Sequence, residues 1–574
     1  MPTNSYKINP KATKSIHYTL YYGTFIHTPD LTTLEINFNT LVGVNEQGTI
    51  DFIHKDYDAS LYNNKSPIQF FIDQREHPHS QPHQENHGQQ RYQHFEFVDY
   101  SHDLTKFFIP GFIDTHIHAS QYPNIGIGLG TPLLDWLKKY TFPLENHFCQ
   151  SGQEQEQEQE QEQEQETKLQ FANEIYNQVI QRTLENGTTC ASYFTTIDPE
   201  TTNLFAELLL INGQRGFVGK VCMDHNEPYQ EYQESIEDCE KSMHKIINHI
   251  EKLNPNTNTN TNKNLVTPII TPRFAPVCSD KILKFLGELS HEKNLPIQTH
   301  ISENKQEIEL VDKLFPDCEN YASVYNKFNL LTNKTILAHA IHLTPKECQL
   351  IKLKNCSISH CPTSNTFLSS GEAPIYKYLY HDNINVSLGT DVSGGFDYSI
   401  LQIIKHAILV SHHLNMHKSN TTTNTTTKND VDERLSIKDG IYMATMGGAK
   451  AVGLQDIIGS FEIGKQFDVQ LIDLSTRQIN YHYHSHNHNH NHNHNHNHTI
   501  PTISDNSSRI DIFNWQYPVN KDLDKMKDLL GKWIFNGDDR NCIKVWCNGR
   551  LVINKEKYNH RDDRWVITNS NGHN

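Results

Sequence analysis

Two histidines separated by one residue, His116 and His118, are the residues of this sequence best placed to bind a metal ion. They end the segment IPGFIDTHIH, which is apolar up to the pair and is therefore typical of a buried strand. In an extended chain, residues two positions apart point to the same side, so both imidazoles can face one ion. In a chain with 36 histidines, an isolated pair of this kind is as often a feature of a surface strand as it is a metal site. The prediction therefore depends on further ligands.

Other polar residues lie at the ends of further apolar, β-branched runs. These residues are Arg273, His300, His339, His360 and Asp391. If the runs are parallel strands of one barrel, their carboxyl ends meet at one face, where barrel enzymes carry their active sites. His300 and Asp391 then complete a four-ligand site with the histidine pair. Such a site suits Zn²⁺ or Fe²⁺ and leaves one coordination position for water.

A metal ion bound in this way predicts hydrolytic chemistry. It lowers the pKa of a bound water to about 7, so the sequence predicts attack by a metal-activated hydroxide. Asp391 is a candidate acceptor for the water proton, and Glu303, in THISEN, is a candidate to carry a proton to the substrate. Glu303 is equally consistent with a carboxylate at the start of a helix. His339 is either a neutral core histidine or a hydrogen-bond partner of the attacking hydroxide.

The elements that position these residues follow an alternation of strands and helices. Eight short apolar runs are each followed by a polar or helical stretch, which is typical of a parallel sheet or barrel. We therefore predict an α/β protein with a closed (β/α)₈ barrel of the TIM type. The runs are 108–115, 188–194, 216–223, 266–273, 295–300, 335–339, 356–360 and 384–391.

The two ends of the chain differ from this middle part. Alternating strands with glycine turns occupy residues 17–53, 459–473 and 543–554. This pattern predicts one small β domain to which both chain ends contribute. We expect the barrel at 106–455 and the two parts of the β domain within 1–105 and 456–574.

Low-complexity segments interrupt this pattern. We expect all five to be disordered surface insertions, because they lack the apolar residues that offset the entropy of ordering. The His-Asn segment is the densest histidine cluster in the chain, but a flexible repeat offers no fixed geometry for catalysis. The segments are His/Gln-rich 74–94, Gln-Glu 153–166, Asn-Thr 254–264, Thr/Asn-rich 420–430 and His-Asn 482–498.

Charge and composition argue against several classes of protein. The net charge of −17 argues against a nucleic-acid binder, which needs concentrated lysine and arginine. Residues 1–18 lack the apolar core of a signal peptide, and no apolar run is long enough to span a membrane. Eleven cysteines without a CxxC pair predict reduced thiols. We therefore expect a cytosolic protein without a membrane or nucleic-acid partner.

Longer motifs surround the candidate residues. They include PGFIDTHIHASQYPN (110–124), PRFAPVCS (272–279), QTHISEN (298–304), SHCPTSN (359–365) and LGTDVSGG (388–395). These motifs resemble the eukaryotic guanine deaminases of the amidohydrolase superfamily, and the resemblance covers most of 106–473. It implies a distorted barrel joined to a small β-sandwich. It also implies hydrolysis of guanine to xanthine and ammonia, in guanine catabolism, by a cytosolic homodimer.

The resemblance also implies roles for individual residues. One zinc ion per subunit is expected on His116, His118, His300 and Asp391. The expected catalytic residues are Glu303, His339 and Asp391. The residues expected to contact the purine are His118, Gln121, Arg273, Phe274, His300 and Asp391. His360 resembles a residue of the pocket wall or one just behind the ligands.

Several alternatives stay open from the sequence. The ion is zinc or iron, and the ring is guanine, another aminopurine or a triazine, which would be distinguished at Gln121 and Arg273. A non-catalytic protein that keeps the fold is a third alternative, against which the intact metal and proton-shuttle residues argue. The other zinc deaminase pattern, H-x-E followed by P-C-x-x-C, is absent, so the sequence favours the amidohydrolase route.

Overall fold

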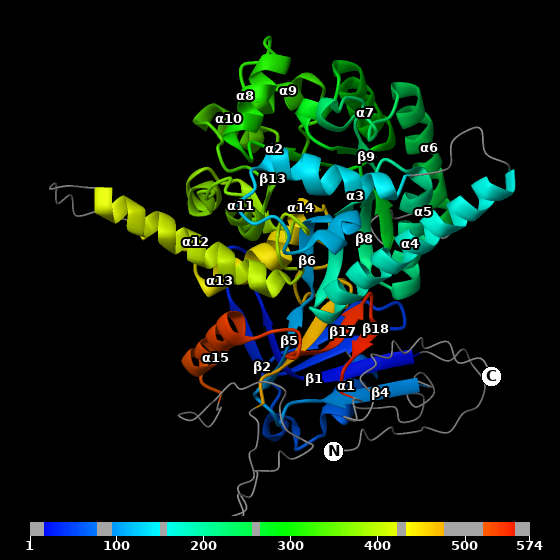
Figure 1. Cartoon of the computed structure of the whole chain (residues 1–574). Coiled ribbons are helices and arrows are strands. Elements are labelled where there is room, and N and C mark those ends of the chain that lie inside the picture. The colour runs from blue at the N-terminus through cyan, green and yellow to red at the C-terminus, as the bar shows by residue number, and fades with distance from the viewer. Residues whose placement is uncertain are drawn as a thin grey trace, which may run out of the picture.

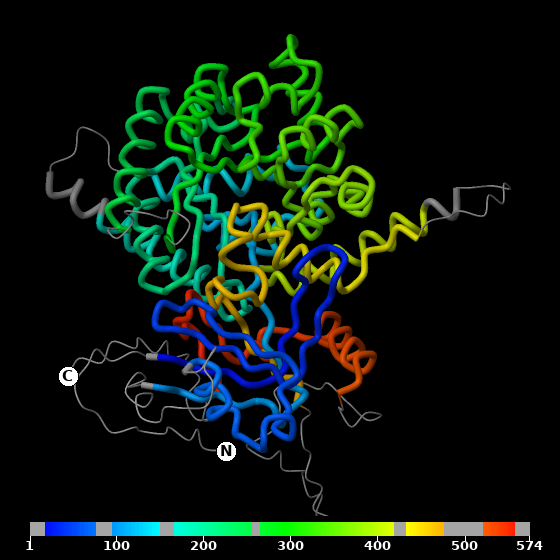
Figure 2. Tube along the Cα trace, turned by 180° about the vertical axis from the view of Figure 1, so that it is seen from behind, coloured from blue at the N-terminus to red at the C-terminus, as the bar shows by residue number. Residues whose placement is uncertain are grey.

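The computed structural model describes residues 17–76, 94–149, 158–254, 264–421, 432–475 and 521–556. These residues form a barrel wrapped by helices and a β domain beside it (Figure 1). Seen from behind, segments from both ends of the chain lie together in the β domain, as the sequence predicted (Figure 2).

Eight strand positions make up the barrel. One parallel sheet contains β6 (Phe112–His118), β7 (Thr188–Phe194), β8 (Arg215–Gly219) and β10 (Val266–Pro268). A second contains β12 (Ile297–Ile301), β13 (Thr335–His339), β14 (Ser357–His360) and β15 (Asn385–Leu388). A short pair, β9 (Val221–Cys222) and β11 (Thr271–Pro272), extends the third and fourth positions. Every predicted run overlaps one of these strand positions.

Backbone hydrogen bonds join the two parallel sheets at both seams. At one seam, Ile270 pairs with Ile297 in parallel. At the other, the Asp391 N–H donates to the His116 carbonyl over 2.8 Å. The barrel predicted from the sequence is therefore confirmed, and its second seam runs directly through two of the candidate metal ligands.

Helices between the strands cover the outside of the barrel. Two of them, α4 (Glu158–Glu185) and α12 (Ile400–Thr421), project on opposite sides of the molecule (Figure 1). The other α-helices are α1 (Pro67–Glu76), α2 (Leu133–Trp136), α3 (Phe142–His147), α5 (Pro199–Asn212), α6 (Ile236–Leu253), α7 (Asp280–Lys293), α8 (Lys305–Leu314), α9 (Tyr321–Lys327), α10 (Pro345–Leu353), α11 (Pro362–Phe367), α13 (Ile437–Tyr442), α14 (Gly448–Ala451) and α15 (Leu523–Asn536). Short helical turns are η1 (Ala59–Tyr62), η3 (Ala119–Asn124), η4 (Leu137–Thr141), η5 (Glu227–Tyr229), η7 (Ala275–Val277), η8 (Lys377–His381) and η9 (Met443–Gly447).

The structure corrects the predicted disorder at the edges of the low-complexity segments. α4 begins inside the Gln-Glu segment, so the prediction is wrong for residues 158–166. Glutamate and glutamine are good helix formers, and a helix that packs further along the chain extends into them. In the same way, α12 ends at Thr421, α1 at Glu76, and β4 begins at His94. The segment 482–498 lies outside the described residues, as do most residues of 74–94, 254–264 and 420–430.

The β domain is one strongly curved eight-stranded sheet. Its strands are β1 (His17–His27), β2 (Glu35–Val44), β3 (Ile50–His54), β4 (His94–Asp99), β5 (Lys106–Pro110), β16 (Val469–Asp473), β17 (Cys542–Cys547) and β18 (Arg550–Asn554). β17 and β1 are three strands apart in the sheet order, yet the rings of Tyr21 and Trp546 lie only 5.6 Å apart. Because neighbouring strands are about 4.8 Å apart, this contact requires the sheet to fold over its own core.

β5 connects the β domain to the barrel. It pairs antiparallel with β16, and a single residue, Gly111, separates it from β6. A Cβ at Gly111 would lie 2.1 Å from Thr189 Oγ1, so only glycine allows this close approach to β7. α15 covers the junction, since the Trp533 ring stacks on Phe112 at 5.9 Å. The strand that carries the histidine pair is therefore anchored from the β domain.

All eleven cysteines are free and nine are buried, as expected for reduced thiols. In the described ranges, no helix combines the length and the apolar character that crossing a membrane requires.

Candidate active site

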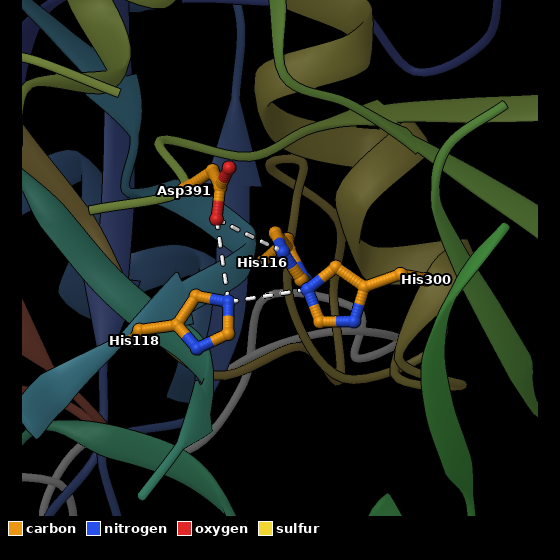
Figure 3. Close-up of side chains that lie close together, drawn as sticks. All are labelled: His116, His118, His300 and Asp391. Atoms are coloured by element: carbon orange, nitrogen blue, oxygen red, sulfur yellow. Dashed lines mark hydrogen bonds and ion pairs between the residues drawn. The ribbon is translucent and has the colours of Figure 1, made fainter. Parts of the chain in front are cut away.

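The four candidate metal ligands converge at the carboxyl ends of the barrel strands (Figure 3). Asp391 Oδ1 lies 3.2 Å from His116 Nε2 and 3.3 Å from His118 Nε2. His118 Nε2 in turn lies 3.3 Å from His300 Nε2. The ligand atoms of all four residues lie within 4.8 Å of one another, and this group can hold a metal ion. Three imidazoles and one carboxylate are the ligand types of hydrolytic zinc sites.

The protonation states of the candidate ligands suit the binding of a cation between them. Burial lowers the pKa of His116 to about 4 and that of His300 well below its ordinary value, so both rings are neutral. His300 Nδ1 lies 2.6 Å from the Arg273 carbonyl, which requires the ring proton on Nδ1 and leaves the Nε2 lone pair free for an ion. Burial acts to raise the pKa of Asp391, but His116 and His118 outweigh it and hold the pKa well below its usual range.

A buried carboxylate that sequence reasoning missed, Asp114, holds the seam beneath the ligands. It accepts hydrogen bonds from the His116 N–H at 3.1 Å, the Thr390 N–H at 3.1 Å and the Thr390 hydroxyl at 2.5 Å. It therefore ties β6 to the loop that carries Asp391. Burial raises the pKa of Asp114 to about 7. The signal in the sequence was an acidic residue inside the apolar segment IPGFIDTHIH.

Glu303 and His339 stand beside the candidate ligands. His339 Nε2 lies 3.5 Å from Glu303 Oε2 and 3.7 Å from Asp391 Oδ2, and His339 Nδ1 lies 2.9 Å from Asn365 Oδ1. Burial, reinforced by the negative charge of Asp391, raises the pKa of Glu303 well above its ordinary value. Helix α8 is capped by Asn304 together with another glutamate, so the Glu303 carboxyl is not needed at the helix start. Glu303 is thus a buried acid at the cavity.

One cavity contains most of the residues predicted to act on the substrate. His118, Gln121, Arg273, Phe274, His300, Glu303, His339 and Asp391 line it. Its apolar wall consists of Leu133, Trp136, Leu137 and Leu368. His360 is buried at the end of β14 and does not line the cavity, so of its two predicted places only the one just behind the ligands is left. Burial lowers the pKa of His360 to about 3, as for a neutral core histidine.

Glu145 is a second residue that sequence reasoning missed. Its Oε2 accepts from Arg273 Nη1 at 2.5 Å, and its Oε1 accepts from Arg273 Nη2 at 3.2 Å and from Gln121 Nε2 at 2.8 Å. Burial acts to raise the pKa of Glu145, but the adjacent guanidinium outweighs it and keeps the pKa below its ordinary value. A buried arginine requires a counter-charge, and this need was the available signal.

The sequence of this chain also matches a known family along most of its length. Residues 107–552 match the model of the amidohydrolase family. The chain belongs to the amidohydrolase family. The match spans the whole barrel, together with β5, β16, β17 and part of β18, so it covers every residue of the candidate active site.

Within the amidohydrolases, several guanine deaminases resemble this chain along most of its length. It is 41% identical to a probable guanine deaminase of Schizosaccharomyces pombe, over 82% of this chain and 76% of the relative. It is 37% identical to a guanine deaminase of Dictyostelium discoideum, over 94% and 99%. A crystal structure of a guanine deaminase from C. acetobutylicum, with guanine bound in its active site, superposes with a TM-score of 0.68. That structure is 29% identical and covers 93% of this chain and 100% of its own.

Proposed function

We propose that this amidohydrolase is a zinc-dependent guanine deaminase, which hydrolyses guanine to xanthine and ammonia. The observation that carries the proposal is one cavity in which a three-histidine, one-aspartate cluster faces Gln121, Arg273 and Glu303. Relatives that match nearly the whole chain and bear the name guanine deaminase support the choice of ring.

We propose that His116, His118, His300 and Asp391 bind the zinc ion. Neutral imidazoles and an ionised carboxylate are the forms that ligate a divalent cation, and the pKa directions of His116, His300 and Asp391 favour these forms. Zinc held there supplies a water nucleophile at neutral pH by lowering the pKa of the water.

The side chains around the ligands are suited to handle protons. The reaction adds water at the ring carbon that bears the amine and releases ammonia, so the adjacent ring nitrogen must gain a proton. Glu303, whose pKa is raised by burial, holds a proton that it can donate to that nitrogen. His339 lies between Glu303 and Asp391 and is placed to hydrogen-bond the attacking oxygen. Asp391 is placed to accept the proton that the water loses.

The rest of the cavity is suited to hold a flat polar ring. Arg273 offers donors to a ring carbonyl, Gln121 offers an amide to the ring edge, and Phe274 offers an apolar wall. The apolar side chains of α2 and η4 close the other side and exclude water, which strengthens the polar contacts inside.

Turnover of guanine together with metal analysis tests the proposal. Purified protein is expected to contain one zinc per chain and to release ammonia and xanthine from guanine. Protein that contains zinc but leaves guanine unchanged would overturn the choice of substrate, and iron in place of zinc would overturn the choice of metal. A panel of other aminopurines and triazines, on Gln121→Ala and Arg273→Ala, distinguishes the alternative rings.

We further propose that the enzyme is a cytosolic homodimer. The support for the dimer is a projecting helix, α12, with apolar side chains exposed along it. On α12, Leu409 is 40% exposed and Met416 is 56% exposed. Phe396, which precedes the helix and is 38% exposed, packs on His406 of α12. Sedimentation analysis is expected to give a dimer, and a Leu409→Glu/Met416→Glu variant is expected to shift it toward the monomer. A wild-type monomer would contradict the proposal.

A further inference from the structure

Glu145 lies outside the metal cluster but contacts two polar residues that line the cavity, Gln121 and Arg273. It is fully buried on α3, and it receives two hydrogen bonds from Arg273 and one from Gln121. The carboxylate therefore joins the α2–η4–α3 segment, which walls the cavity, to the end of β11.

The contact with Gln121 determines which end of its amide faces the ring. The Gln121 NH₂ group donates to Glu145 Oε1 over 2.8 Å. Within the described part of the chain, Gln121 Oε1 accepts no hydrogen bond, so the oxygen end is left for a ligand in the cavity. A glutamine without such a partner can present either end, because the two orientations of its amide have the same shape. Gln121 is thereby fixed as an acceptor.

The contact with Arg273 determines the charge of that side of the cavity. Two of the five guanidinium N–H bonds go to Glu145, and the guanidinium also lies 5.1 Å from the Phe142 ring centroid. The remaining N–H bonds can donate to a ring carbonyl, while the positive charge is compensated by the carboxylate. A compensated guanidinium retains directional donors but loses its long-range attraction for anions.

We propose that Glu145 is a positioning residue that fixes Gln121 as an acceptor and neutralises Arg273, so that the cavity selects an uncharged purine ring. This inference rests on the proposed function, in which Gln121 and Arg273 contact the substrate. It extends that function, because it identifies Glu145 as the group that excludes anionic rings of the same size as guanine.

Two substitutions at Glu145 separate charge from geometry. Glu145→Gln keeps the shape but removes the charge, and Glu145→Asp keeps the charge but is too short to reach both Arg273 and Gln121. The probes are hypoxanthine, a neutral ring, and urate, an anion at neutral pH, with binding measured by calorimetry. In Glu145→Gln we expect the preference for hypoxanthine over urate to fall about tenfold or more, and the KM for guanine to rise by a larger factor than kcat falls. In Glu145→Asp we expect a raised KM with an unchanged preference.

Asp468→Asn is the matched control. Asp468 forms a second buried pair with Arg215, at 3.1 Å, at the opposite end of the barrel where β8 begins. This control is expected to lower stability without changing KM or the hypoxanthine-to-urate preference. A wild-type KM in either Glu145 variant, or a wild-type preference in Glu145→Gln, would overturn the inference. If Glu145→Gln does not fold, the KM of Glu145→Asp decides. Absence of guanine turnover in the wild type overturns the proposed function instead, because calorimetry needs no turnover.

Discussion

Glu303 combines a buried carboxyl group with a place beside both His339 and Asp391. If it donates the proton to the ring, Glu303→Gln removes a general acid and is expected to lower kcat by about 10²–10⁴-fold. Zinc content is expected to stay unchanged, because Glu303 is not among the proposed ligands. Steady-state kinetics with metal analysis measures both.

Glu347→Gln is a suitable control for Glu303→Gln. Glu347 is also a buried carboxylate, but it caps α10 through the Thr344 N–H and does not line the cavity. We expect it to affect stability and to leave kcat within a few-fold of wild type. An equally small effect of Glu303→Gln would show that another group supplies the proton.

Asp391 is expected to act both on the metal and on the water. Asp391→Ala should lose most turnover and also bind zinc more weakly, because one ligand and one proton acceptor disappear together. Asp391 adopts a left-handed backbone conformation with φ of 48°, which alanine tolerates poorly. Asp391→Asn, which tolerates that conformation better, separates the loss of the carboxylate from backbone strain. Comparable activity in both variants would show that the proposed site is wrong.

At the residue scale, the sequence allowed prediction of the groups at strand ends but not of their partners. His116, His300 and Asp391 could be found because a polar residue after an apolar run is conspicuous. Asp114 and Glu145 act through other side chains, and their partners lie elsewhere in the chain, at Thr390 and Arg273. Such pairings depend on how the barrel closes, which local patterns do not reveal.

Among the elements, α15 links the β domain to the strand that bears the histidine pair. Trp533 is 1% exposed and its ring lies 5.6 Å from Phe107 and 5.9 Å from Phe112. Trp533→Ala is expected to destabilise the fold by about 3–5 kcal/mol, because it leaves a cavity at this junction. Urea denaturation measures the loss.

Phe535 on the same helix provides the comparison for Trp533. It is 42% exposed, so Phe535→Ala is expected to change the free energy of unfolding by less than about 1 kcal/mol. If the two substitutions destabilise equally, α15 does not anchor the junction.

At the element scale, the strands followed from the sequence, whereas some helix boundaries did not. All eight runs overlap strands, because each is short and rich in β-branched residues and is followed by a clear polar break. The start of α4 at Glu158 was missed because a repetitive polar segment gives no amphipathic pattern. Its helical state comes from the good helix formers in the segment and from the packed helix that follows.

For the whole molecule, the sequence predicts that the His-Asn segment takes no part in catalysis. The described residues stop at 475, just after β16, and resume at 521, before α15, so neither attachment point is on a strand that carries a candidate site residue. Deleting 482–498 is therefore expected to leave kcat, KM and zinc content unchanged. Assays of the deletion variant beside the full chain test this, and loss of zinc on deletion would contradict it.

The pairing of β5 with β16 and of β16 with β17 has a consequence for biosynthesis. β16 ends at Asp473 and β17 begins only at Cys542, so the ribosome must add the long segment between them before β16 gains its second neighbour. At about 5–20 residues per second, this interval lasts several seconds. Throughout it, the growing chain carries a nearly complete barrel next to an open sheet edge, which is a site for pairing with other chains. Shortened products that stop before Cys542 should therefore aggregate rather than accumulate as soluble enzyme.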